Sequence, residues 1–104
     1  MNDVLERPAV KTATKQVQLV IEGRVQGVGF RAWTKAQARK LGLNGFVRNR
    51  MDGTVEAHFS GPQEIVVDMI ARCHEGPMVA RVTKVTQRPS QHTFASGFEL
   101  KDTL

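Results

Sequence analysis

The fold is decided by residues 17–42, which read VQLVIEGRVQGVGFRAWTKAQARKLG. Val17, Leu19 and Ile21 recur at every second position, the period of a β-strand with one buried face. Residues 30–41 instead repeat apolar residues at the spacing of one face of an α-helix. Gly42 follows at the position where a left-handed residue ends a helix at little cost. A strand therefore passes into a helix through a short connection that is rich in glycine.

This connection, GRVQGVGFR over residues 23–31, is suited to binding an anion. Glycine tolerates positive φ, so consecutive backbone N–H groups can converge on one point. The loop enters a helix N-terminus, whose unpaired N–H groups and dipole attract negative charge. Arg31 lies in the first helical turn, where its planar guanidinium can bind two phosphate oxygens. The spacing excludes a P-loop and a GxGxxG dinucleotide loop; a tight turn without a ligand is the alternative.

The rest of the chain alternates strand and helix patterns. After the first strand, from residue 16, and the helix, strand patterns cover residues 45–50, 54–59, 80–88 and 96–101, and a second helix covers residues 63–73. Phe98 and Leu100 of the last strand are expected to point inward. The order is βαββαβ plus a short terminal strand. It predicts an α+β fold of the ferredoxin-like split βαβ type, with two helices on one face of an antiparallel sheet.

Composition predicts a single soluble domain over residues 16–104, preceded by a flexible tail over residues 1–15. Fifteen Lys and Arg against ten Asp and Glu give a net charge of +5, which favours an anionic partner. No apolar run approaches the roughly 18 residues of a membrane helix, and the N-terminus lacks the apolar core of a secretory signal. Cys73, the single cysteine, is expected to pack in the core. We expect a cytoplasmic protein that does not bind membranes.

Two segments resemble the signature motifs of the acylphosphatases: GRVQGVGFR at residues 23–31 and GFVRNRMDGTVE at residues 45–56. The spacing of the motifs, the length of the domain and the order of the strands also agree, as does GPMVARV at residues 76–82. The resemblance covers about residues 16–101. It implies an enzyme that hydrolyses the carboxyl-phosphate anhydride of small acyl phosphates to a carboxylate and inorganic phosphate.

The resemblance also implies which residues act. Arg31 would bind the substrate phosphate, and Asn49 would position the attacking water. The loop amides would form the phosphate cradle, and they belong to Arg24, Val25, Gln26, Gly27, Val28, Gly29 and Phe30. A carboxylate whose acid has a pKa near 4 leaves without a proton donor, so no catalytic histidine or carboxylate is needed. No cofactor is expected.

Other polar residues carry weaker signals. His58, His74 and His92 are scattered along the chain, and no pair has a metal-ligand spacing with a suitable third partner, so we expect no metal site. Arg48 and Arg50 should project away from Asn49's face of the strand and are expected to be surface charges.

Three alternatives compete with a free-standing acylphosphatase. An RNA-recognition module shares the strand order, but TVEAHF offers only Phe59 for base stacking, so no nucleic-acid partner is expected. Acylphosphatase-like domains also begin the large carbamoyltransferases of hydrogenase maturation. This chain ends at Leu104 without the zinc-finger-like region found there, so a free-standing enzyme is expected. We also expect a monomer. A relative that shares only the fold is disfavoured because Arg31 and Asn49 are both present. The acyl group has no recognisable sequence code.

Overall fold

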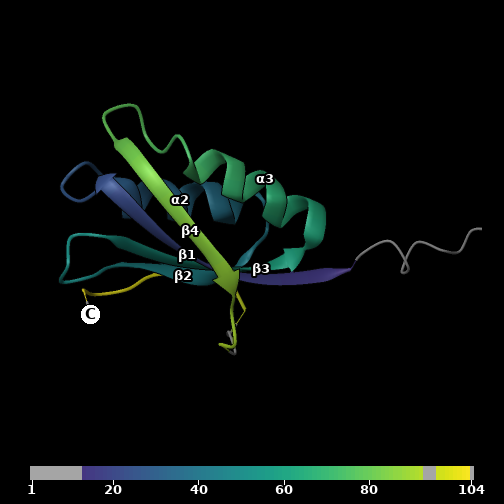
Figure 1. Ribbon diagram of the computed structural model, residues 1–104. Helices are drawn as coiled ribbons and strands as arrows, with labels where there is room; N and C mark the ends of the chain where they lie inside the picture. Colours follow the sequence, from purple (N-terminus) through teal and green to yellow (C-terminus); the bar gives the residue numbers. More distant parts are fainter. Residues whose placement is uncertain (1–12, 93–95, 104) are drawn as a thin grey trace, which may run out of the picture.

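The computed structural model describes residues 13–92 and 96–103, which form one sheet with two helices on one of its faces (Figure 1). The strands are β1 (Thr14–Arg24), β2 (Asn44–Asn49), β3 (Val55–Pro62), β4 (Arg81–Pro89) and β5 (Phe98–Leu100), and the helices are α2 (Phe30–Lys40) and α3 (Gln63–Cys73). This element order confirms the predicted α+β arrangement. Strand β1 begins two residues before its predicted start, and the rest of the predicted tail, residues 1–12, lies outside the described residues.

The sheet has the strand order β4-β1-β3-β2-β5. Strand β1 pairs antiparallel with β3 and β4, and β2 pairs antiparallel with β3. Strand β5 pairs parallel with β2, so the short terminal strand adds one parallel pair to the predicted antiparallel sheet. The reason is geometric, because the chain leaves β4 at one edge and crosses to the other. Strand β4 runs opposite to β2, so a strand that starts at the end of the sheet where β4 finishes runs in the same direction as β2.

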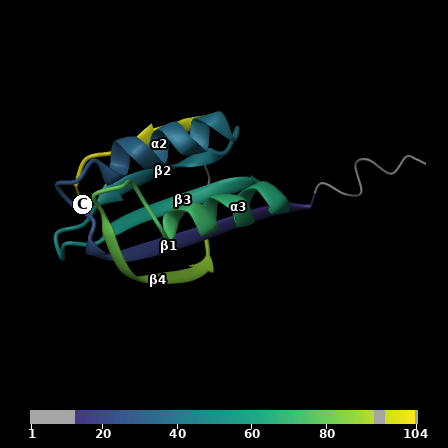
Figure 2. The ribbon, with the colours of Figure 1, turned by 90° about the horizontal axis from the view of Figure 1, so that it is seen from above.

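The core lies between the sheet and the two helices. The register pairs Val17 with Phe59 and Leu19 with Ala57 on the helix side of the sheet, and all four side chains are buried. Helix α2 packs on β2 and β5, and α3 packs on β1 and β3 (Figure 2). The helices add Phe30, Thr34, Ala38, Val66, Met69 and Cys73 to the buried set. Neither helix is long and apolar enough to cross a membrane, nor is any other in the described ranges.

Cys73 is fully buried at the end of α3, as predicted. Burial raises the pKa of its thiol to about 12, so the reactive thiolate is scarce at pH 8. We expect alkylation by iodoacetamide at pH 8, followed by mass spectrometry across a urea series, to follow the unfolded fraction. Rapid labelling of the folded protein would show that the end of α3 opens independently.

The open face of the sheet, away from the helices, carries a buried polar group at its centre. Glu56 and His58 of β3 are both almost fully buried there. Arg48 of β2 is paired with Glu56, with Nε 3.2 Å from Oε1, and its side chain is only 21% exposed. The interpretation of Arg48 as a plain surface charge was therefore wrong, because the register places it directly beside a carboxylate.

The titrating groups of this face have shifted pKa values. Burial pushes the pKa of Glu56 upward, but hydrogen bonds from His58 and Arg48 outweigh burial and leave it below its ordinary value. Burial lowers the pKa of His58 in spite of the hydrogen bond to Glu56, so the imidazole is neutral at pH 7. The rings of His58 and His92 lie only 4.5 Å apart, centroid to centroid. The description of the histidines as scattered was therefore wrong for this pair, since the segment after β4 folds back over β3.

Candidate active site

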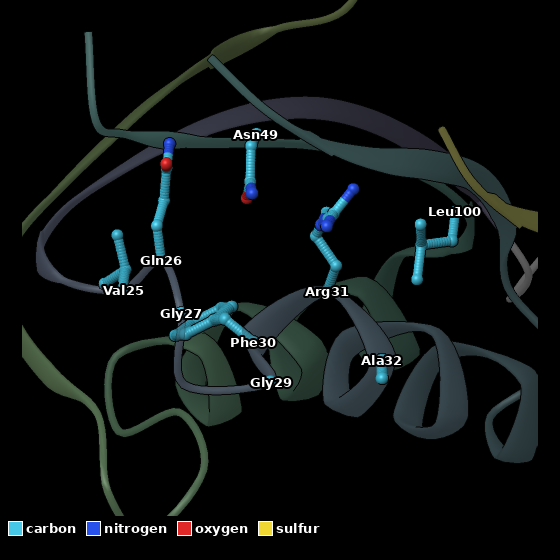
Figure 3. A pocket seen from close by; sticks show the side chains of 9 residues that line it. All are labelled: Val25, Gln26, Gly27, Gly29, Phe30, Arg31, Ala32, Asn49 and Leu100. Carbon is cyan, nitrogen blue, oxygen red and sulfur yellow. The ribbon is translucent and has the colours of Figure 1, made fainter. Parts of the chain in front are cut away.

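Three segments meet at one end of the sheet: the β1–α2 loop, the end of β2 and the end of β5 (Figure 2). Together they enclose a hollow of about 180 Å³ (Figure 3). Its lining consists of Val25, Gln26, Gly27, Gly29, Phe30, Arg31, Ala32, Asn49 and Leu100. The volume is below the roughly 300–1,000 Å³ typical of pockets for drug-sized ligands. The hollow therefore suits a small ligand.

Two glycines give the loop its shape. Gly27 has a φ of 74° and Gly29 a φ of 78°, both in the left-handed region that disfavours a side chain. A Cβ atom added at either position would meet no other atom within 4 Å. Glycine is therefore needed here for the backbone conformation and not for space.

The loop ends at the N-terminus of α2, where Gly29 is the N-cap residue. The first intrahelical bond runs from the Trp33 N–H to the Gly29 carbonyl, at 3.0 Å. The amides of residues 30–32 come before that bond and have no partner within the helix. Among the described residues, no side chain caps this end of the helix and no acidic residue occupies its first turn. The helix thus presents free donors and the positive end of its dipole to the hollow.

Arg31 places a cation over these donors. Its side chain is half-buried, and Nη1 donates a hydrogen bond to the Lys101 carbonyl at 3.2 Å. None of the ion pairs within the described ranges includes Arg31. The guanidinium is therefore held from one side by the chain beyond β5, and no carboxylate of residues 13–92 or 96–103 forms an ion pair with it.

Asn49 reaches the same hollow from the sheet. It is the last residue of β2, and it pairs with the buried Val55, which fixes its side chain on the helix side. In the part of the chain that the structure describes, its carboxamide has no hydrogen-bond partner within the protein. Figure 3 shows the side chains of Asn49 and Arg31 directed into the same space from opposite walls. Two residues far apart in sequence thus face the same small hollow.

Gln26 has a structural role that sequence reasoning missed. Its Nε2 donates to the carbonyls of Arg50 and Thr54, each at 2.8 Å, on the two sides of the β2–β3 turn. These bonds tie the loop to the strand end that carries Asn49. The sequence predicts a role for the backbone amide of Gln26 alone, because no spacing rule reveals the target of a side-chain amide.

The end of β5 forms the last wall. Phe98 is buried, as predicted, but Leu100 is 38% exposed and lines the hollow with Ala32, so the prediction of an inward Leu100 was wrong. Both side chains point to the helix side of the sheet by the period of a strand. Phe98 lies beneath α2, whereas Leu100 lies at the open end where α2 begins.

We expect Gly29→Ala to impair function more than stability. The left-handed conformation should cost about 1–2 kcal/mol of unfolding free energy and displace the amides that follow. Gly42→Ala is the matched control, because Gly42 lies at the other end of α2 with a φ of 74° and equally open surroundings. Urea unfolding should show similar losses for both variants, and only Gly29→Ala should lose phosphate affinity. Equal phosphate affinity in the two variants would contradict a role for the loop shape.

Comparisons with known proteins show the family of the chain. Residues 17–100 match the family model described as Acylphosphatase. An acylphosphatase of Nitrobacter hamburgensis is 60% identical over 72 residues, which are 69% of this chain and 73% of that protein. One of Azorhizobium caulinodans is 47% identical over 92 residues, covering 88% of this chain and 99% of that protein.

The same likeness extends to solved structures. The crystal structure of an acylphosphatase from Bacillus subtilis has a TM-score of 0.78 and 31% sequence identity, covering 86% of this chain and 99% of that one. The family match spans nearly all the described residues and includes the loop, Arg31 and Asn49. The chain therefore belongs to the acylphosphatase family, hydrolases that act on acyl phosphates.

Proposed function

We propose that this chain hydrolyses small acyl phosphates by direct attack of water on phosphorus. Arg31 and the loop amides bind the phosphate, and Asn49 positions the water. The observation that carries the proposal is the arrangement of one hollow, with Arg31 and Asn49 directed into it above the free N-terminus of α2. The small volume favours substrates with short acyl groups.

Phosphate binding follows from the charges around the hollow. The loop lines the hollow with Val25, Gln26, Gly27, Gly29 and Phe30, and Arg31 in the first turn of α2 adds a full positive charge, whereas Arg24 pairs with Arg81 of β4 and neither it nor Val28 belongs to the lining. Phosphoryl transfer spreads negative charge over the equatorial oxygens, which donors fixed in advance stabilise without reorganisation. The loop and the guanidinium thus act more strongly on the transition state than on the bound substrate.

Asn49 supplies what the attacking water needs. Its carboxamide offers an acceptor and two donors, enough to fix the orientation of one water. Approach from the wall opposite the loop would place that water in line with the leaving oxygen. The water oxygen bonds to phosphorus, the bond from phosphorus to the carboxyl oxygen breaks, and the carboxylate leaves with the electron pair. The proton of the water passes to solvent or phosphate.

The lining of the hollow fits a reaction without a protein acid. None of its nine residues is a histidine, aspartate or glutamate. A carboxylate leaving group needs no proton at neutral pH, because its conjugate acid has a pKa near 4. This restricts the substrate to phosphates with good leaving groups, and alkyl phosphate esters should be hydrolysed poorly.

Hydrolysis in ¹⁸O-labelled water tests the position of attack. We expect the label in inorganic phosphate and none in benzoate when benzoyl phosphate is the substrate, as detected by mass spectrometry. Phenyl phosphate, an ester with a poorer leaving group, is the control and should be hydrolysed far more slowly. Label in benzoate would show attack on the carbonyl carbon and would overturn the proposed roles.

A further inference from the structure

A second group of chemically active side chains lies on the open face of the sheet. Glu56 and His58 occupy alternate positions of β3, so both point away from the helices. His92 follows β4 and lies against them. One imidazole nitrogen from each histidine and one carboxylate oxygen of Glu56 lie within 4.8 Å of one another. Two of the three residues are buried, and His92 is exposed and borders solvent.

The set of donors is one that transition metals prefer. Two imidazoles and one carboxylate leave a fourth position for water on a tetrahedral Zn²⁺. Ligand atoms around such an ion stand about 3.3 Å apart, given metal–ligand bonds near 2.0–2.1 Å. Glu56 Oε2 and His58 Nε2 are now 2.6 Å apart, so an ion would widen this pair by less than about 1 Å. The exposed His92 would close on the ion from the solvent side.

Ser90 supports both histidines from behind. Its Oγ lies 2.9 Å from His58 Nδ1 and accepts a hydrogen bond from the His92 backbone N–H at 3.3 Å. A hydroxyl can donate or accept, so Ser90 can stabilise the tautomer in which His58 Nε2 is free of its proton. Hydrogen bonds of this kind orient the histidines of metal sites. The side chain of Gln16 fixes the same segment through the carbonyls of Ser90 and His92.

The surrounding charges restrict which ion can bind. Arg48 donates to both carboxylate oxygens of Glu56, from Nε to Oε1 at 3.2 Å and from Nη2 to Oε2 at 3.4 Å, and the Lys101 ammonium lies 4.7 Å from the centre of the neighbouring Phe46 ring. A single carboxylate near two cations is a poor site for Ca²⁺ or Mg²⁺, which need several oxygen ligands. Imidazole nitrogen instead favours zinc, copper and nickel. The two cations weaken the binding of any divalent ion, and the two imidazoles favour an ion that prefers nitrogen ligands.

We propose that Glu56, His58 and His92 form a binding site for a divalent transition-metal ion, with Zn²⁺ as its reference ligand. The site lies on the face of the sheet opposite Asn49, because Glu56 alternates with Val55, the partner of Asn49. It is separate from the hollow and independent of acyl phosphate hydrolysis. Bound metal would tie the segment after β4 to the centre of the sheet.

Calorimetric titration of the full, tag-free chain with ZnCl₂ tests the site, together with ¹⁵N spectra of the histidine rings. We expect one Zn²⁺ per chain, with shifts of the imidazole nitrogens of His58 and His92 only. His74, exposed at the end of α3, is the internal reference. MgCl₂ should give no saturable heat. Cys73 is buried and should not compete.

Variants separate this site from adventitious zinc. His92→Ala removes an exposed ligand, so the fold should persist while saturable binding is lost. His74→Ala should bind Zn²⁺ as the parent does. Ser90→Ala keeps all three ligands and should weaken binding roughly 10–100-fold. Absence of stoichiometric binding to the parent, or equal affinity in the parent and His92→Ala, would overturn the proposal.

Discussion

Arg31→Ala is expected to lose hydrolysis of benzoyl phosphate almost completely, with kcat/KM reduced by about 10³-fold or more. Arg31 supplies the full positive charge directed into the hollow. In phosphoryl transfer such a guanidinium stabilises the negative charge of the transition state. Initial rates measure the loss. Far-UV circular dichroism should remain native, because the side chain is only half-buried and, among the described residues, makes a single hydrogen bond, to the Lys101 carbonyl.

Arg39→Ala is the matched control for this variant. Arg39 also projects from α2 and also donates to a backbone carbonyl, from Nε to that of Phe98 in the last strand at 3.2 Å. It lies at the other end of the helix, away from the hollow. Its removal should leave kcat/KM within about threefold of the parent. Substantial activity in Arg31→Ala would contradict the catalytic role of the guanidinium, and an equal loss in Arg39→Ala would show that both arginines act by anchoring the last strand.

Asn49→Ala is expected to lower kcat roughly a hundredfold or more, since a water displaced by about 1 Å can cost that much. The inhibition constant of inorganic phosphate should change little, because the phosphate rests on the loop and Arg31. Steady-state kinetics with phosphate as competitor separate the two effects. A large rise in that constant with kcat preserved would assign Asn49 to phosphate binding instead.

Asn44→Ala provides the comparison at the other end of β2. Its Oδ1 accepts the Gly97 N–H at 2.7 Å, so the variant loses a structural hydrogen bond beside β5. We expect a reduced melting temperature and an unchanged kcat. The pair of variants thus distinguishes an asparagine that positions water from one that supports the sheet.

The part of the site that could be predicted from sequence is the part built from neighbours in the chain. The glycines, the helix start and Arg31 fall within nine residues. Their spacing therefore predicts a glycine-rich loop that leads into the N-terminus of α2. Helix α3 begins and ends where its apolar period begins and ends. The role of Asn49 could be predicted only from the family resemblance, because a polar residue at the end of a strand can serve many purposes.

Contacts between distant segments could not be predicted in the same way. Gln26 reaches across to the β2–β3 turn, and Arg48 meets Glu56, through registers that no local pattern encodes. The pairing of His58 with His92 depends on where the chain crosses after β4. The strand period correctly predicts that Leu100 points to the helix side of the sheet. Its exposure instead depends on where α2 begins above it. These errors arise from tertiary placement and not from secondary structure.

Nuclear magnetic resonance of the ¹⁵N-labelled chain, titrated with inorganic phosphate, tests the central claim most directly. The account predicts saturable shifts concentrated at the amides of residues 24–32 and at Arg31 Nε, with the amides beside Glu56 and His58 unchanged. It also predicts that Arg31→Ala abolishes these shifts and Asn49→Ala retains them. Shifts centred on the open face of the sheet, or undiminished in Arg31→Ala, would contradict the assignment of the hollow as the phosphate site.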